Sequence, residues 1–208
     1  NTTAGNNTAV GSSALLVNTT GANNVAMGSL ALDANTTGSS NIAIGTNALG
    51  ANTTADSNTA VGSSALAANT TGVNNAGFGS SALTTNTTGN SNTASGLNSL
   101  NLNTTGSQNV AVGQQALNAN TTADNNTAVG FQALLANTTG ASNTAIGASA
   151  LAANTTNSNN TAVGYYALKV STAGNNTAVG TNAGLVTAAG NYNTFMGANT
   201  AIANTSGY

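Results

Sequence analysis

Residues 120–136 read NTTADNNTAVGFQALLA, and this 17-residue stretch recurs with variations along the whole chain. Its general form is N-T-T-x-x-x-N-[TVI]-A-[VI]-G-x-x-A-L-x-x, and we number its positions 1 to 17. A fixed short period is the signature of a repeat architecture in which each unit packs only against its neighbours. Ten consecutive copies open with Asn-Thr-Thr, at Asn1, Asn18, Asn35, Asn52, Asn69, Asn86, Asn103, Asn120, Asn137 and Asn154.

The last two copies depart from this form. The eleventh is one residue short and carries STAG at 171–174, so we expect an irregular coil near 170–186. The twelfth contains NTFMG at 193–197, and the repeat restarts in phase at 204–208. Residues 1–208 are therefore interpreted as a single array of about twelve 17-residue coils, and we expect it to be a segment of a longer array.

The composition of the unit favours β-structure over helix. Thr, Asn and Gly dominate the unit, and these residues are poor in helix interiors. Its apolar residues do not follow the spacing of an amphipathic helix, and a Gly interrupts every copy. Positions 8 to 10 instead show the period-two alternation of a strand. The sequence predicts an all-β fold: a repetitive parallel β-solenoid, or β-roll, of 17-residue coils.

Two positions are identical in all twelve copies and predict structural columns along the solenoid. Position 7 is Asn, and stacked Asn side chains can form a ladder of amide-to-amide hydrogen bonds. Position 11 is Gly, which ends the strand where a turn needs positive φ or where two backbones approach closely. The first ten copies place these ladder residues at Asn7, Asn24, Asn41, Asn58, Asn75, Asn92, Asn109, Asn126, Asn143 and Asn160, and at Gly11, Gly28, Gly45, Gly62, Gly79, Gly96, Gly113, Gly130, Gly147 and Gly164.

The two faces of the strand differ in residue size. Position 10 is large and apolar in most copies, position 8 is usually Thr, Val or Ile, and position 9 is Ala in ten copies. We expect positions 8 and 10 to face inward. Position 9 needs a small residue, which is also consistent with a covered face. Leu at position 15, from Leu15 to Leu168, is expected to be the second apolar anchor of each coil.

Each coil has few large apolar residues, which bears on oligomeric state. Burying one of them contributes roughly 1.5–3 kcal/mol, whereas ordering the backbone costs about 1–2 kcal/mol per residue. Backbone ladders must supply part of the difference, and association of several chains is expected to supply more. The sequence thus favours a homo-oligomer of rods, each about 55 Å long at the usual strand spacing.

The composition excludes most chemistry. The chain contains no His, Cys, Pro or Trp, and its charged side chains are Asp33, Asp56, Asp124 and Lys169. No His or Glu is present to activate the many Ser and Thr hydroxyls, and the three scattered carboxylates are interpreted as solvated surface, too few for a metal site. One Lys does not neutralise a nucleic-acid backbone. We expect no enzyme, metal, cofactor or nucleic-acid partner, and no transmembrane segment in this region.

The unit N-[TV]-A-[VI]-G-x-x-A-L resembles the head repeats of trimeric autotransporter adhesins, with their apolar-Ala-apolar-Gly core. The longer form A-L-x-A-N-T-T-G-x-x-N-T-A-V-G is similar to repeats in bacterial surface and phage tail-fibre proteins related to those adhesins. The resemblance covers nearly the whole chain and implies a left-handed parallel β-roll, a homotrimer, and a head that binds a host-surface protein or glycan. The best-known head repeat of the family is shorter, so the extra residues around Asn-Thr-Thr are expected to enlarge a turn.

The Asn-Thr-Thr column has three interpretations. Asn and Thr side chains bond locally to backbone, which favours a hydrogen-bonded turn ladder. A regular outward rank of Thr is instead a candidate ice-binding surface, although position 12 is too mixed to supply a second rank. The triplet is also a formal N-glycosylation acceptor, which we interpret as a coincidence of composition.

Positions 12, 13, 16 and 17 vary between copies, and we expect ligand contacts there. The candidate surface contacts are Phe131, Tyr165, Tyr166 and Lys169, because exposed aromatic residues anchor partners or sugars. The alternatives are packing against a neighbouring chain and the approach to the end of the array.

The leading functional hypothesis is a structural and adhesive fibre, exposed outside a cell, at its surface or on a virion. Such a rigid rod presents many weak contacts, and avidity strengthens the attachment. The alternatives are an ice-binding β-solenoid and a self-assembling surface filament.

Overall fold

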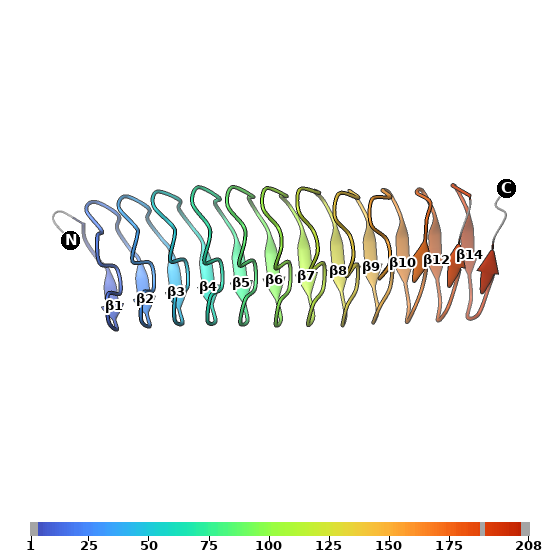
Figure 1. Ribbon diagram of the computed structural model, residues 1–208, viewed down its shortest axis with the longest axis horizontal. Coiled ribbons are helices and arrows are strands. Elements are labelled where there is room, and N and C mark those ends of the chain that lie inside the picture. Colours follow the sequence, from blue (N-terminus) through green and yellow to red (C-terminus); the bar gives the residue numbers. More distant parts are fainter. Residues whose placement is uncertain (1–3, 188–189, 205–208) are drawn as a thin grey trace.

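The computed structural model describes residues 4–187 and 190–204, and it is a parallel β-solenoid (Figure 1). A 12-stranded sheet runs along the rod, with strands in chain order and β1 and β14 at opposite ends (Figure 1). Its strands are β1 (Thr8–Val10), β2 (Val25–Met27), β3 (Ile42–Ile44), β4 (Thr59–Val61), β5 (Ala76–Phe78), β6 (Thr93–Ser95), β7 (Val110–Val112), β8 (Thr127–Val129), β9 (Thr144–Ile146), β10 (Thr161–Val163), β12 (Thr177–Val179) and β14 (Thr194–Met196).

Every strand of this sheet is three residues long and occupies positions 8 to 10 of its copy. Equivalent positions pair in parallel, as Ala111 does with Ala128, so identical columns form along the rod. Between β10 and β12 the partners are Thr161 and Thr177, sixteen residues apart, so the shortened copy keeps the register of the sheet. The predicted all-β solenoid and its repeat are confirmed, and no helix occurs in the part of the chain that the structure describes.

A second sheet begins where the Asn-Thr-Thr triplets end. It contains β11 (Val170–Ser171), β13 (Val186–Thr187) and β15 (Ala203–Asn204), which pair in parallel. These short strands stand where the earlier coils place the end of one copy and the start of the next. The segment 170–186, where we expected an irregular coil, thus differs from the earlier coils by this second sheet, while most of the restart expected at 204–208 lies outside the described residues.

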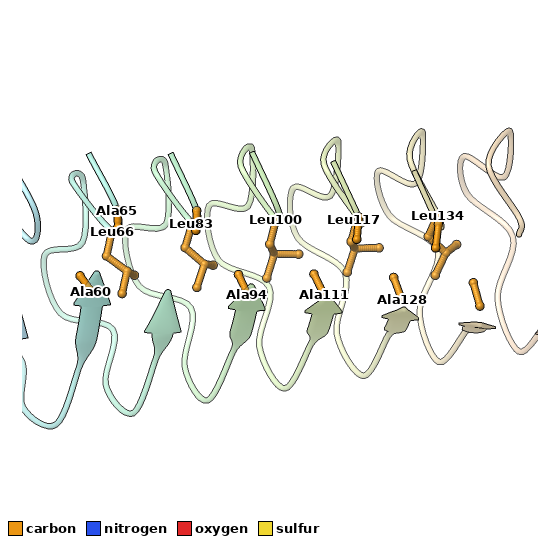
Figure 2. Close-up of a cluster of buried hydrophobic side chains, with 14 of the residues drawn as sticks. Ala60, Ala65, Leu66, Leu83, Ala94, Leu100, Ala111, Leu117, Ala128 and Leu134 are labelled. Carbon is orange, nitrogen blue, oxygen red and sulfur yellow. The ribbon is translucent and has the colours of Figure 1, made fainter. Parts of the chain in front are cut away.

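The apolar core of the rod is narrow and consists of three columns, beside which the Asn side chains at positions 1 and 7 are also buried. The alanines at positions 9 and 14 and the leucine at position 15 are fully buried in most coils. Figure 2 shows the strand residues Ala94 and Ala111 facing Leu100 and Leu117 across this interior. Because one Leu and two Ala fill the space between the walls, a 17-residue coil has no room for a second large side chain.

The prediction that positions 8 and 10 face inward is wrong. Position 9 faces the interior, so the period-two alternation of a strand turns positions 8 and 10 outward. Val10 is 56% exposed and Phe78 is 44% exposed, whereas Ala60 and Ala128 are fully buried. The prediction of Leu at position 15 as an apolar anchor is confirmed, since Leu32 to Leu168 have no exposed surface in any copy.

The segment after each strand turns sharply through backbone conformations that L-residues rarely adopt. Position 11 has φ near 130°, as in Gly96 with φ of 138°, and positions 13 and 15 lie in the left-handed region, as in Gln115 and Leu117. A Cβ on Gly96 would lie 2.6 Å from the carbonyl carbon and oxygen of Gly113 in the next coil. Both reasons for which the sequence predicted a Gly column, positive φ and close backbone approach, are confirmed.

Candidate functional site

The Asn side chains at position 1 form a continuous amide ladder inside the turn. Asn35 Nδ2 donates to Asn18 Oδ1 of the preceding coil at 2.8 Å and to the carbonyl oxygen of Gly38 at 2.9 Å. The same pair of bonds recurs in successive copies as far as Asn154. From Asn18 to Asn154 these side chains are buried, so the folded rod does not expose them as glycosylation acceptors.

The Asn side chains at position 7 mainly bond to the backbone. The Oδ1 atom of Asn24 accepts the backbone N–H of Asn41 at 2.9 Å, and Asn41 Nδ2 donates to the carbonyl oxygen of Ala55 at 2.8 Å. Amide-to-amide bonds occur in some copies, as from Asn92 to Asn75 at 3.2 Å. The ladder predicted at position 7 is present, but its regular amide-to-amide form occurs at position 1.

The two threonines of the triplet have different roles. At position 2, Thr36 Oγ1 donates to the carbonyl oxygen of Thr53 in the next coil at 3.0 Å, and most copies repeat this bond. At position 3, the threonines from Thr20 to Thr156 are exposed. The triplet is thus the predicted hydrogen-bonded turn ladder, with one outward rank of Thr beside it.

The outer face of the 12-stranded sheet carries two columns of side chains, at positions 8 and 10. We call this surface the strand face. Its column at position 10 is large and apolar in eleven copies and interrupted by Ser95. None of the four charged residues lies in it. Its most exposed apolar members are Val10, Met27, Ile42, Ile44, Phe78, Val112, Ile146 and Met196.

The aromatic residues predicted as surface contacts lie in two places. Tyr165 and Tyr166 stack with ring centroids 3.9 Å apart, and Lys169 Nζ lies 3.9 Å from the centroid of Tyr166. A hydrogen bond from Tyr165, and then the positive charge of Lys169, lower the pKa of Tyr166, while the same bond raises the pKa of Tyr165. Phe131 stands two coils away, at the position in its copy that Tyr165 occupies.

The exposed carboxylates at position 5 are hydrogen-bonded. Asp56 Oδ1 accepts the backbone N–H of Ser39 at 2.7 Å, and Asp124 Oδ1 accepts that of Ser107 at 2.6 Å. They therefore extend the turn ladder at the surface, a role that the sequence analysis missed. Across the described residues, no group of three or more His, Cys, Asp or Glu could hold a metal ion, and no helix is long and apolar enough to cross a membrane.

The turn ladder ends at the shortened copy, and three buried polar atoms lie unpaired there. Asn154 Oδ1, Asn160 Nδ2 and Asn176 Nδ2 have no hydrogen-bond partner. The next copy has Ser171 in place of the triplet's Asn, and Ser171 Oγ bonds within its own turn, to the carbonyl oxygen of Ala173 at 3.1 Å. The ladder ends here because the eleventh copy is one residue shorter and because Ser171 lacks the side-chain amide of Asn.

No family model, curated protein or solved structure significantly matches this chain.

Proposed function

We propose that this chain is a segment of a structural and adhesive fibre, outside a cell or on a virion, in which several copies associate through the strand face. The observation that carries the proposal is the exposure of the apolar column at position 10 along the sheet. Exposed apolar surface of this extent on a soluble protein marks a site of association. The few large residues in the interior give the same reason for association, since burial between chains adds the hydrophobic stabilisation that one coil lacks.

The size of the strand face fits a specific interface. Twelve strands spaced by about 4.8 Å give a length of about 55 Å, and two columns of side chains give a width of about 10 Å. Two such faces together bury about 1,100 Å², near the lower end of specific interfaces. Three chains around one axis bury more surface on each chain, and the resemblance to trimeric adhesin heads favours that number. No charge lies on the face to oppose contact between identical chains.

The molar mass in solution, measured by light scattering, tests the association. We expect three times the mass of one chain for the native protein. The pair Val112→Lys and Val129→Lys, in the column at position 10, should give single chains. The matched pair Thr105→Lys and Thr122→Lys, at the exposed position 3, adds the same charge elsewhere and should leave the assembly intact. A native protein of single-chain mass, or dissociation by both pairs, contradicts the proposal.

The adhesive role is measured separately, as retention of labelled protein on surfaces coated with polysaccharide or with protein. Retention should be stronger for the assembly than for the dissociated Val112→Lys and Val129→Lys pair, since one rod presents fewer contacts than several. If the two forms are retained equally, avidity does not strengthen the attachment and this part of the proposal is wrong.

Ice binding is the second candidate, because the threonines at position 3 form an exposed rank from Thr20 to Thr156. Against it, the hydroxyls at position 2 bond within the rod, as Thr36 Oγ1 does with Thr53. A thermal hysteresis measurement separates the two candidates, since an ice binder must show it and an adhesive fibre should not.

A further inference from the structure

The column at position 12 changes character in the second half of the rod. In the first five copies it contains only Ser and Thr. In copies six to ten it reads Leu97, Gln114, Phe131, Ala148 and Tyr165. Large apolar side chains thus alternate with a polar or small one, and Leu97, Phe131 and Tyr165 are 46%, 47% and 48% exposed. We call these five residues the position-12 row.

Backbone hydrogen bonds fix the spacing of this row. The carbonyl oxygen of Phe131 accepts the N–H of Ser149, and that of Ala148 accepts the N–H of Tyr166, so successive members of the row lie in adjacent coils. Adjacent coils are about 4.8 Å apart. The row therefore presents an exposed apolar group every two coils, about 10 Å apart, on a rigid backbone.

The last member of the row, Tyr165, packs against a neighbouring aromatic side chain. The ring of Tyr165 stacks on Tyr166 at 3.9 Å, and Lys169 lies over the ring of Tyr166. Such stacking restricts the orientation of the Tyr165 ring, so little conformational freedom is lost when a ligand binds. Side-chain amides lie close to these exposed apolar residues. Gln114 is exposed between Leu97 and Phe131, and in the neighbouring column Gln132 donates to Gln115 at 2.9 Å.

We propose that the position-12 row binds an extended β-1,4-linked glycan chain laid along the rod axis. In such a chain alternate sugars present the same face, and the repeat of two sugars is close to two coil steps. The apolar face of every second sugar can then lie on Leu97, Phe131 or Tyr165, while Gln114 and the neighbouring amides reach its hydroxyls. A glycan also suits a surface with only one basic side chain nearby, because the ligand needs no charge. The inference rests on the adhesive role proposed above and names its ligand class.

Isothermal titration of the assembled protein with cellohexaose and with chitohexaose tests the proposal. Binding of at least one of these oligosaccharides is expected, and comparison of the two shows whether an N-acetyl group is required. An α-1,6-linked oligosaccharide of glucose, which lacks the extended two-sugar repeat, should not bind. Absence of binding to both β-1,4 probes, or equal binding of the α-1,6 probe, overturns the proposal.

Four variants test the residues and their spacing. Phe131→Ala and Tyr165→Ala should each weaken binding by about three- to tenfold, the range of one aromatic contact. Tyr192→Ala removes a ring that is 80% exposed and lies on neither the strand face nor the position-12 row, so it should leave glycan binding unchanged. The double variant Phe131→Ala with Ala148→Phe keeps the number of rings but moves one by a single coil, and it should bind as weakly as Phe131→Ala alone. Full binding by this double variant would overturn the spacing argument.

Light scattering of the same samples separates this inference from the proposed function. If the native protein assembles but binds no β-1,4 probe, the glycan site is wrong and the fibre proposal stands. If the protein is a single chain but binds the probe with the expected variant pattern, the site stands and the association through the strand face is wrong.

Discussion

The first ten coils and the last two differ in the hydrogen bonds that join neighbouring coils at the turn between copies. From the second coil to the tenth, a buried Asn at position 1 connects successive coils through side-chain hydrogen bonds, and in most of these coils a Thr at position 2 adds another. In the last two, β13 and β15 continue the second sheet that starts at β11, and backbone pairing replaces that ladder. The comparison shows that the solenoid needs bonds between coils at this turn, but that either side chains or backbone can supply them.

The interior differs between the two regions as well. At position 15 of the eleventh copy Gly184 replaces Leu, and at position 9 of the twelfth Phe195 replaces Ala. A Cβ on Gly184 would lie 2.6 Å from the ring of Phe195 and 3.0 Å from Leu168, so the ring takes the space that a leucine fills elsewhere. The two substitutions together conserve the volume of the interior, which is the kind of change that packed cores tolerate best.

The largest effect is expected from a methyl group in the Gly column. Gly96→Ala should lower the free energy of unfolding by about 3–5 kcal/mol, because the strained φ and the contact with Gly113 both oppose it. Gly197→Ala, at the same position of the last copy, would have only Thr200 Cγ2 at 3.5 Å, so it should cost about 1–2 kcal/mol. Denaturant unfolding of the two variants measures the difference. Equal costs would mean that backbone conformation alone, without the packing of coils, requires Gly here.

The exchange between Gly184 and Phe195 predicts a compensating pair. Phe195→Ala should cost about 2–4 kcal/mol by leaving a cavity, and Gly184→Leu alone should also destabilise the end of the rod because the leucine meets the Phe195 ring. The double variant restores the pattern of the earlier coils and should recover most of the stability lost in Phe195→Ala. A double-mutant cycle on unfolding free energies measures this coupling, and additive costs would contradict it.

The turn ladder should be more sensitive in its middle than at its end. Asn103→Ala removes the bonds from Nδ2 to Asn86 and Gly106 and the bond that Oδ1 accepts from Asn120, at an expected cost of about 2–4 kcal/mol. Asn154→Ala also loses two donated bonds, but it removes an Oδ1 atom that has no partner. Its cost should therefore be smaller by about 1–2 kcal/mol. Unfolding of both variants under one condition decides this, and a larger cost for Asn154→Ala would refute the argument.

The smallest effect concerns the aromatic pair near the boundary of the two regions. As the pH rises, Tyr166 should lose its proton below the ordinary tyrosine pKa of 10.0, and Tyr165 above it, because the bond between them favours a neutral Tyr165 beside an ionised Tyr166. Lys169→Ala should raise the pKa of Tyr166 but leave it lowered, since the bond from Tyr165 is the larger cause. Ultraviolet absorbance titration of the phenolates measures both steps. An unchanged titration in Lys169→Ala would exclude the charge as a cause.

Much of the fold could be predicted from the sequence because each structural requirement appears at the same position in many copies of the repeat. The period, the strand at positions 8 to 10, the Gly column and the leucine at position 15 all follow from local pattern. Period two shows that Thr127 and Val129 share a face, but not whether that face is inside. Residue size indicated the wrong side, because the space between the walls is set by the length of the coil and is filled by Ala128 and Leu134.

The site was harder to predict because its geometry depends on contacts between copies. Positions 1 and 7 are both Asn, and only the distance between coils decides which column bonds amide to amide. The sequence also indicated the exchange between Gly184 and Phe195. In two neighbouring copies, Gly replaces the usual Leu at position 15 and Phe replaces the usual Ala at position 9. The alternation of Leu97, Phe131 and Tyr165 was also visible in the sequence, but it acquires meaning only once position 12 is placed on the surface.

The arrangement of one short strand per coil has a mechanical consequence. The chain advances along the rod by about 4.8 Å per coil, yet 17 residues pulled straight extend to nearly 60 Å. Force applied between the two ends would detach one coil at a time from the end of the stack, since each coil is bonded only to its neighbours. Each detachment releases roughly 50 Å of slack at nearly constant load. The rod therefore stores more than ten times its own length as extension, and would lengthen under a sustained pull.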